Sequence, residues 1–251
     1  MILAWVLALL VDFVSVSGYT SLYMSVGRQK SDLEAMAKEL GASVFGVCEV
    51  GELAEGFHPE LRDRSNTLPY AVAIGVAIQP AVLETLDGRP NELYKSHYRI
   101  TNSRLDDISF RMAQTISQMG HSVLPIPASK VLSRFPMIGH VNHREIAFKA
   151  GLGWRGKNNL LVNPLSGSRL RLTTVLTDLR LEADPVSDQT CGRCSACRRR
   201  CPAGAIGETP EEFSLEKCRD QVAHFSKEND FGLMICGLCL NHCPVRAKRN
   251  G

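Results

Sequence analysis

The spacing of apolar residues predicts a helix near the start of the folded chain. In SDLEAMAKELG, residues 31–41, apolar side chains recur at intervals of three and four residues, which is typical of a helix with one buried face. Ser31 and Glu34 fit a capping box at its start, and Gly41 fits its C-terminal stop.

The same spacing predicts two more helices. The longer one covers about residues 93–119 and ends at Gly120. The shorter one, NHREIAFKAG, begins after Asn142 as a plausible cap and stops at Gly151.

Short apolar runs predict the strands between these helices. The run YAVAIGVAI is almost entirely apolar, so we expect a strand that is buried on both faces. A polar loop is expected over 52–69, and the last two strands are expected to form a hairpin through the turn LSGS. The expected strands are 43–50, 70–78, 121–128, 158–164 and 170–178.

Composition and cysteine positions divide the chain. A hydrophobic content of 44% and a charged content of 22% are ordinary for a globular protein, and a net charge of +3 makes no case for nucleic-acid binding. Eight of the nine cysteines follow residue 190. We therefore predict an α/β domain over 28–187 and a ferredoxin-like α+β module with two [4Fe–4S] clusters over 188–251. The apolar residues 1–27, which Asp12 interrupts, are expected to be an extension outside the fold.

The run CGRCSACRRRCP has the spacing C-x₂-C-x₂-C-x₃-C-P, which is that of bacterial ferredoxins with two clusters. In such a run three thiolates bind one cluster and the fourth binds the other. Together with Cys218 and the later run CGLCLNHCP, eight cysteines fill eight ligand positions. We assign one cluster to Cys191, Cys194, Cys197 and Cys243, and the other to Cys201, Cys218, Cys236 and Cys239.

Other uses of the thiols stay open. Paired Cys-x₂-Cys turns also occur in zinc ribbons, which hold one ion with four ligands. Disulfides fit less well, because disulfide scaffolds spread their cysteines through a short secreted chain. Cys48 lies in an apolar run and is expected to be a small core residue.

Several motifs resemble the epoxyqueuosine reductase family, which is related to the reductive dehalogenases. They are, in order, AGLGWRGKNNLLV, VLTD, the four-cysteine run, EKCRD and CGLCLNHCP. The resemblance implies a cobalamin in the α/β domain and two clusters that pass electrons to it. It also implies that Gly153, Gly156, Lys157 and Asn158 bind the corrinoid. The glycine-rich turn itself predicts that Lys157 and Asn158 are exposed.

Two departures bear on the substrate. Where the family carries an aspartate that acts as an acid, this chain has His143, which we take as the candidate proton donor. The chain also ends soon after Cys243. We expect a cytoplasmic reductase of a small-molecule or modified-nucleoside substrate, supplied by a low-potential donor of the ferredoxin or flavodoxin type. A tRNA partner is possible but not favoured. The alternatives are a non-catalytic ferredoxin-type electron carrier, or a partner that activates a corrinoid held by another protein.

Overall fold

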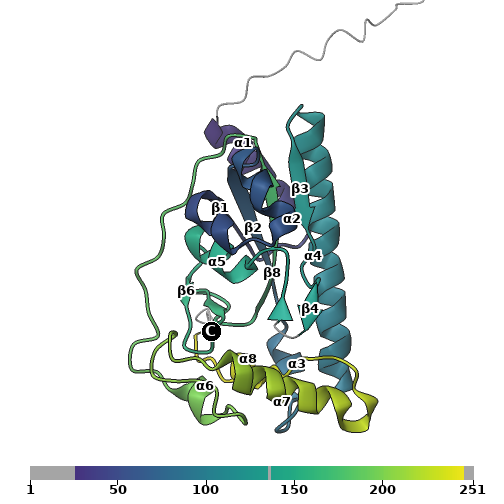
Figure 1. Ribbon diagram of the computed structural model, residues 1–251, viewed down its shortest axis with the longest axis vertical. Helices are drawn as coiled ribbons and strands as arrows, with labels where there is room; N and C mark the ends of the chain where they lie inside the picture. Colours follow the sequence, from purple (N-terminus) through teal and green to yellow (C-terminus); the bar gives the residue numbers. More distant parts are fainter. Residues whose placement is uncertain (1–25, 135–136, 246–251) are drawn as a thin grey trace, which may run out of the picture.

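A four-stranded sheet forms the centre of the protein (Figure 1). The computed structural model describes residues 26–134 and 137–245, so the predicted extension 1–27 lies almost wholly outside the described residues. All neighbouring strands are antiparallel, in the order β1-β2-β8-β3. Their bounds are β1 (Val44–Glu49), β2 (Tyr70–Ala77), β3 (Val123–Ile126) and β8 (Leu170–Thr177).

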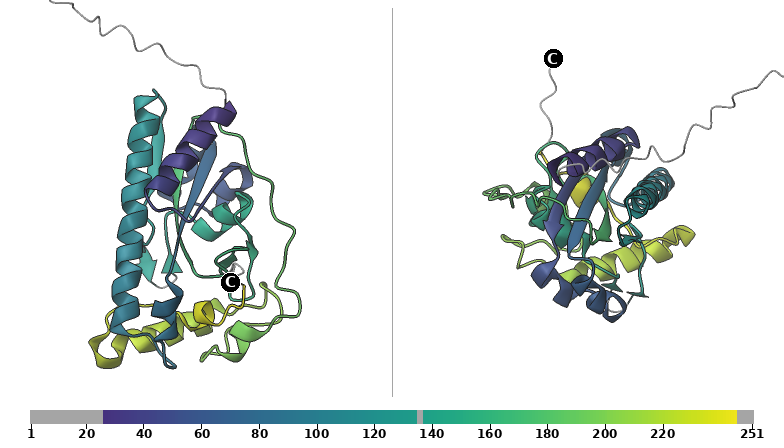
Figure 2. Two further views of the ribbon diagram at one scale, coloured as in Figure 1. Left: turned by 180° about the vertical axis from the view of Figure 1, so that it is seen from behind. Right: turned by 90° about the horizontal axis from the view of Figure 1, so that it is seen from above.

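Two helices cover one face of the sheet, α1 (Val26–Glu39) and α4 (Glu92–Gln118) (Figure 2). The predicted apolar stripe of α1 is confirmed, with Leu33 and Ala37 buried, and Gly41 follows the helix with a φ of +100°. The buried side chains that α4 places on the same face are Leu105, Ile108, Met112 and Ile116. The long-helix prediction is therefore confirmed.

The opposite face packs against α5 (His143–Lys149) and the short helix η2 (Gly51–Gly56). Ile146 and Ala147 of α5 lie in one apolar cluster with Ala73 of β2 and Leu176 of β8. Helices on both faces explain why β2 is almost entirely apolar although its partners are antiparallel. The mixed α/β character is thus confirmed.

Three local predictions were wrong. Helix α1 begins at least five residues before Ser31, whose hydroxyl donates to the carbonyl of Gly27 inside the helix instead of capping its start. The expected loop 52–69 is largely helical, because η2, α2 (Pro59–Arg62) and η3 (Asp63–Asn66) lie within or across it.

The expected hairpin is also different. Strand β7 (Leu161–Val162) pairs with β6 (Trp154–Arg155), whereas β8 enters the central sheet. The remaining short elements are α3 (Pro80–Glu84) and a pair of two-residue strands, β4 (Ser133–Arg134) and β5 (Met137–Ile138).

The chain leaves β8 through an extended segment, 181–190, and enters the cysteine-bearing part. This part contains α6 (Ala196–Arg199), α7 (Leu215–Lys227), η4 (Glu228–Asp230) and α8 (Leu238–Asn241), and its described residues form no strand. The strand component of the predicted ferredoxin-like α+β module is therefore not found there. Helices α7 and α8 lie across the end of the layers opposite α1 (Figure 1).

Two apolar contacts hold this part against the layers. Phe231, Ile235 and Leu238 pack with Leu83 and Tyr94, which belong to α3 and α4. A second, smaller cluster joins Cys243 to Trp154 and Val162 of the β6–β7 hairpin. Among the described residues, no helix has both the length and the apolar character that a membrane span requires.

The close approach of β1 to α5 gives a stability prediction. A Cβ at Gly46 would lie 2.3 Å from the carbonyl oxygen of Ala150, so Gly46→Ala forces the two elements apart. We expect a loss of about 1–3 kcal/mol in the free energy of unfolding. The control is Gly27→Ala in α1, where the new methyl meets no atom within 4 Å and a gain of up to about 1 kcal/mol is expected. Denaturant unfolding followed by circular dichroism measures both, and equal stabilities would contradict the packing.

Candidate metal centres and adjoining pocket

Four cysteines from distant parts of the C-terminal segment line one small cavity of about 90 Å³. Cys191 and Cys194 lie on the loop that leads into α6, Cys197 lies within α6, and Cys243 follows α8. The hairpin residues Trp154 and Val162 form the opposite wall. We call these thiols set one: Cys191, Cys194, Cys197 and Cys243.

The other four cysteines of the segment form a second group, set two: Cys201, Cys218, Cys236 and Cys239. Burial raises the pKa of Cys236 to about 11, with smaller contributions from the nearby Cys218 and Cys201. Burial raises the pKa of Cys239 well above its usual value, and Cys236, Cys218, Cys197 and Cys201 add to that rise. Cys197 belongs to set one, so the two sets are neighbours.

Helix α7 and a glycine turn position set two. Ser214 caps α7 by accepting a hydrogen bond from the Lys217 amide at 3.3 Å, and Cys218 follows on the first turn. Gly237 stands beside Cys236 with a φ of +81°, where a Cβ would lie 2.8 Å from the ring of Tyr94. Only glycine satisfies both the backbone angle and the space at that position.

Two cations of the α/β layers hold the loops of set one. Lys157 is 7% exposed, and its ammonium donates to the carbonyls of Gly192 at 2.8 Å and Cys194 at 3.1 Å. Buried Arg169 donates to the carbonyl of Cys243 at 2.7 Å. The nearest carboxylate to the Lys157 ammonium is that of the exposed Glu208, at 3.9 Å. The cavity of set one therefore lies beside buried positive charge.

The predicted corrinoid residues divide between two places. Lys157 and Asn158 are buried and line the cavity of set one, so the expectation that they are exposed was wrong. Gly153 has a φ of +154°, and a Cβ there would lie 2.1 Å from the Val162 carbonyl. It therefore serves the close packing of the β6–β7 hairpin. Gly156 lines a pocket of about 200 Å³ on the other side of that hairpin.

A larger pocket, of about 520 Å³, opens beside β8. Strand β3 pairs only with residues 174–177 of β8, and Pro127 follows its last residue. Proline has no N–H to extend the ladder, so the first half of β8 has no strand on that side. The pocket lies there, and its apolar lining includes Val141, Leu160, Leu161, Leu170, Leu172 and Leu215.

The two pockets adjoin each other, and Arg144 relates them to set two. The 200 Å³ and 520 Å³ pockets share Arg144, Leu160 and Leu161, so they adjoin each other. Burial raises the pKa of Cys218, Cys201 raises it further, and the guanidinium of Arg144 opposes that rise. Arg144 therefore lines the larger pocket and lies near Cys218 of set two.

His143 lines the larger pocket as a hydrogen-bonded, neutral ring. Its Nε2 lies 3.2 Å from the Pro127 carbonyl oxygen and its Nδ1 lies 2.8 Å from Thr174 Oγ1. A carbonyl only accepts, so the proton sits on Nε2 and the threonine hydroxyl donates to Nδ1. Burial lowers the pKa of His143 to about 4. At neutral pH the ring carries no extra proton.

Arg171 is a pocket residue that the sequence reasoning missed. Its guanidinium lies 4.4 Å from the ring centre of Tyr98 and donates to Asn102 Oδ1 at 2.9 Å, so α4 fixes its orientation. The sequence did contain a sign of this residue, because Arg171 is the single charged residue in an otherwise apolar and hydroxyl-bearing strand. Arg144, next to His143, was missed in the same way.

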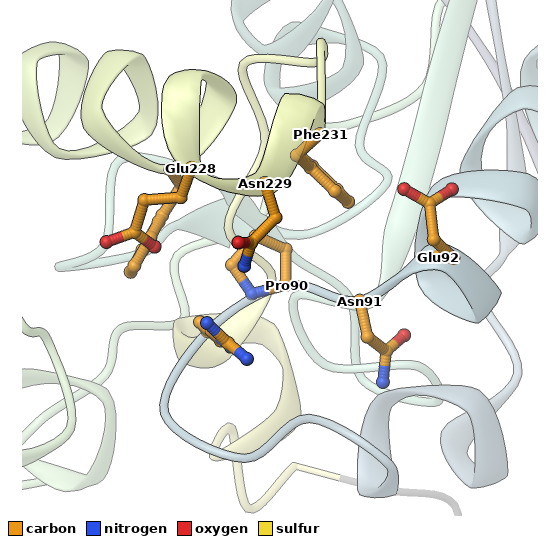
Figure 3. Close-up of a pocket in the computed structure, with 8 residues that line it drawn as sticks. Pro90, Asn91, Glu92, Glu228, Asn229 and Phe231 are labelled. Atoms are coloured by element: carbon orange, nitrogen blue, oxygen red, sulfur yellow. The ribbon is translucent and has the colours of Figure 1, made fainter.

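A separate pocket of about 210 Å³ lies between the start of α4 and the end of α7 (Figure 3). It contains none of the predicted site residues. Near the same helix start, Tyr94 is buried against Gly237, and His97 Nε2 accepts a hydrogen bond from the Gln79 amide at 3.1 Å.

The chain is similar in sequence to epoxyqueuosine reductases and to a reductive dehalogenase. No family model matches. An epoxyqueuosine reductase of Leadbetterella byssophila is 30% identical over 176 residues, which cover 64% of this chain and 54% of the relative. A tetrachloroethene reductive dehalogenase of Sulfurospirillum multivorans is 26% identical over 192 residues, 71% of this chain and 36% of the relative. The chain thus spans about half the length, or less, of these curated relatives.

Solved structures share the fold. A catabolic reductive dehalogenase in complex with 3-bromo-4-hydroxybenzoic acid aligns with a TM-score of 0.72 at 21% identity, over 92% of this chain and 33% of that one. An epoxyqueuosine reductase of Bacillus subtilis aligns with a TM-score of 0.57 at 19% identity, over 89% and 67%. The predicted resemblance is confirmed: the chain is a relative of the epoxyqueuosine reductases and shares its fold with them and with the reductive dehalogenases.

The environment of His143 predicts its titration. Because burial lowers its pKa from 6.5 to about 4, the ring signal should not move between pH 8 and 5.5. The unfolded chain binds this proton more readily, so the residue stabilises the fold fully above about pH 6.5 and loses that contribution as the pH falls towards 4. NMR of ¹³C-labelled histidine rings, assigned with His143→Gln, checks this. A His143 signal that titrates together with added free histidine would contradict it.

Proposed function

We propose that the chain binds two [4Fe–4S] clusters and acts as an iron–sulfur oxidoreductase. The observation that carries this proposal is the gathering of eight cysteines into two neighbouring sets of four, each built from both halves of the C-terminal segment. Set one would hold one cluster and set two the other. The spacing of Cys191 to Cys201 is typical of clusters rather than of zinc.

The surroundings of set one fit such a group. A cluster with four thiolate ligands carries net negative charge, and burying it is costly unless positive charge lies nearby. Lys157 and Arg169 provide that charge, and their contacts with the loop carbonyls also fix the loops that carry Cys194 and Cys243. No three His, Cys, Asp or Glu side chains in the described part of the chain lie close enough together for a single metal ion.

We place a corrinoid in the two adjoining pockets. Their apolar wall suits the face of a macrocycle, and Arg144, Arg171 and Asn142 offer donors at its edge. The clusters, bound at sets one and two, would supply low-potential electrons. The corrinoid, bound in the pockets, would supply a cobalt centre that receives them. Arg144 would then stand between set two and the corrinoid, and Leu215 of α7 would cover one side of the pocket.

The pocket residues suggest roles towards an unidentified substrate. Neutral His143 would act by orienting the substrate, or as a donor from the uncharged ring, since its pKa of about 4 leaves little imidazolium at neutral pH. Arg171 would supply fixed positive charge. A small molecule or a modified nucleoside fits the proposal, and the thiols favour a reducing compartment such as the cytoplasm.

The ligand assignment predicts the metal content of two cysteine variants. After anaerobic reconstitution with iron and sulfide, the parent should hold about eight iron atoms. Cys218→Ala should hold about four, because set two loses a ligand. Cys48→Ala should keep about eight, since Cys48 is a buried core residue beside the Ile146 carbonyl. Iron analysis and electron paramagnetic resonance measure this. Two intact clusters in Cys218→Ala, or zinc in the parent, would refute the assignment.

The pocket assignment predicts the effect of filling it. Leu160 lines both adjoining pockets, so Leu160→Trp should weaken cobalamin binding at least about tenfold, or about 1.4 kcal/mol. Leu165→Trp is the matched control, because Leu165 is 64% exposed in the turn after β7. Binding is followed by the absorbance of added cobalamin, and iron content should not change in either variant. If the parent binds no corrinoid, a ferredoxin-type electron carrier becomes the better description.

A further inference from the structure

Four arginines form an exposed surface on the loop and helix that carry the first cluster cysteines. We call this the arginine surface: Arg193, Arg198, Arg199 and Arg200, all of them exposed. No acidic residue occurs from 191 to 207, so every charged side chain of that segment is positive.

Little of this charge is neutralised within the protein. Arg198 forms an ion pair with Glu208, and Arg199 donates to the hydroxyl of Ser195. In residues 26–134 and 137–245, no carboxylate pairs with Arg193, Arg199 or Arg200. Three exposed guanidinium groups therefore face solvent without a counter-charge, next to thiols that are themselves only partly buried.

The arginine surface lies on the segment that carries the first cluster cysteines. Cys194 and Cys197 of set one lie on the same loop and helix as the arginines. Set two adjoins the larger pocket through Cys218 and Arg144. The arginine surface thus lies beside set one and next to Cys201 of set two, and α6, which carries Arg198 and Arg199, lies at the end of the molecule opposite α1 (Figure 1).

We propose that the arginine surface docks an acidic, low-potential, one-electron carrier protein of the ferredoxin class. This inference rests on the proposed function, because it requires a cluster at set one. One electron leaves the reduced carrier and enters the cluster, so the carrier is oxidised by one electron and the cluster is reduced by one. No proton moves and no bond is formed or broken. Opposite charges steer such encounters and raise association rates by about 10–10³-fold.

A charge-reversal pair tests this with the reconstituted full chain. The variant is Arg199→Glu/Arg200→Glu, and the control is Arg28→Glu/Arg64→Glu, which makes the same charge change at exposed positions on α1 and η3. The probe is an acidic plant-type [2Fe–2S] ferredoxin. Its binding is measured by surface plasmon resonance at low and high salt, and cluster reduction is followed by stopped-flow absorbance with ferredoxin or with dithionite.

We expect the variant to bind ferredoxin at least about tenfold more weakly at low salt and to be reduced by it correspondingly more slowly. The control and the parent should agree, and high salt should remove the difference. Dithionite should reduce every protein equally, which shows that the clusters are intact. Equal ferredoxin binding by variant and parent overturns the docking site alone. Absence of dithionite-reducible clusters in the parent overturns the proposed function with it. Preferential binding of an RNA stem-loop, lost in the variant, assigns the surface to nucleic acid and overturns the proposal as well.

Discussion

The arrangement of the site depends on the contact between buried cations of the α/β layers and the carbonyls of the cysteine loops. Lys157 reaches the carbonyls of Gly192 and Cys194, and Arg169 reaches that of Cys243. These contacts bring the first and last cysteines of the C-terminal segment to one cavity. The cysteine loops contain few apolar side chains, so their own packing contributes little to holding them at this position. The layers supply both the surface and the charge that order it.

The segment that carries these cations also connects the cavity of set one with the two adjoining pockets. The β6–β7 hairpin places Lys157 and Asn158 on the side of set one and Gly156 on the side of the smaller pocket. Strand β8 follows directly, with Arg169 at its entrance and Arg171 in the larger pocket. Two sites with different chemistry are therefore built on one short stretch of backbone.

Much of the fold could be predicted from the sequence, because apolar spacing reports burial directly. The sheet strands, α4 and the stripe of α1 follow from it. The start of α1 could not be found, since Ser31 and Glu34 satisfy a capping pattern that the preceding residues override by continuing the helix. The hairpin prediction failed because adjacency in sequence favoured pairing of β7 with β8, whereas β8 gains more by joining the buried sheet.

The grouping of the cysteines could be proposed from spacing alone, because each ligand run is local and has a regular interval. The pocket could not. It exists because Pro127 ends β3 while β8 continues, and because α4, which is distant in sequence, orients Arg171, while Arg144 comes from a different element, α5. Burial of Lys157 was hidden for the same reason: a lysine in a glycine-rich turn gives no sign of the loop that will cover it.

The truncated pairing of β3 has a consequence for how related chains can diverge. Residues 170–173 pair with β2 but with no strand on their other side, so β2 fixes that wall of the larger pocket. The facing wall, around Gly139 and Asn142, belongs to connecting segments. Insertions there would reshape the larger pocket without moving the strand that carries Arg171. New reactants are therefore most easily accommodated by remodelling one wall while the opposite wall stays as it is.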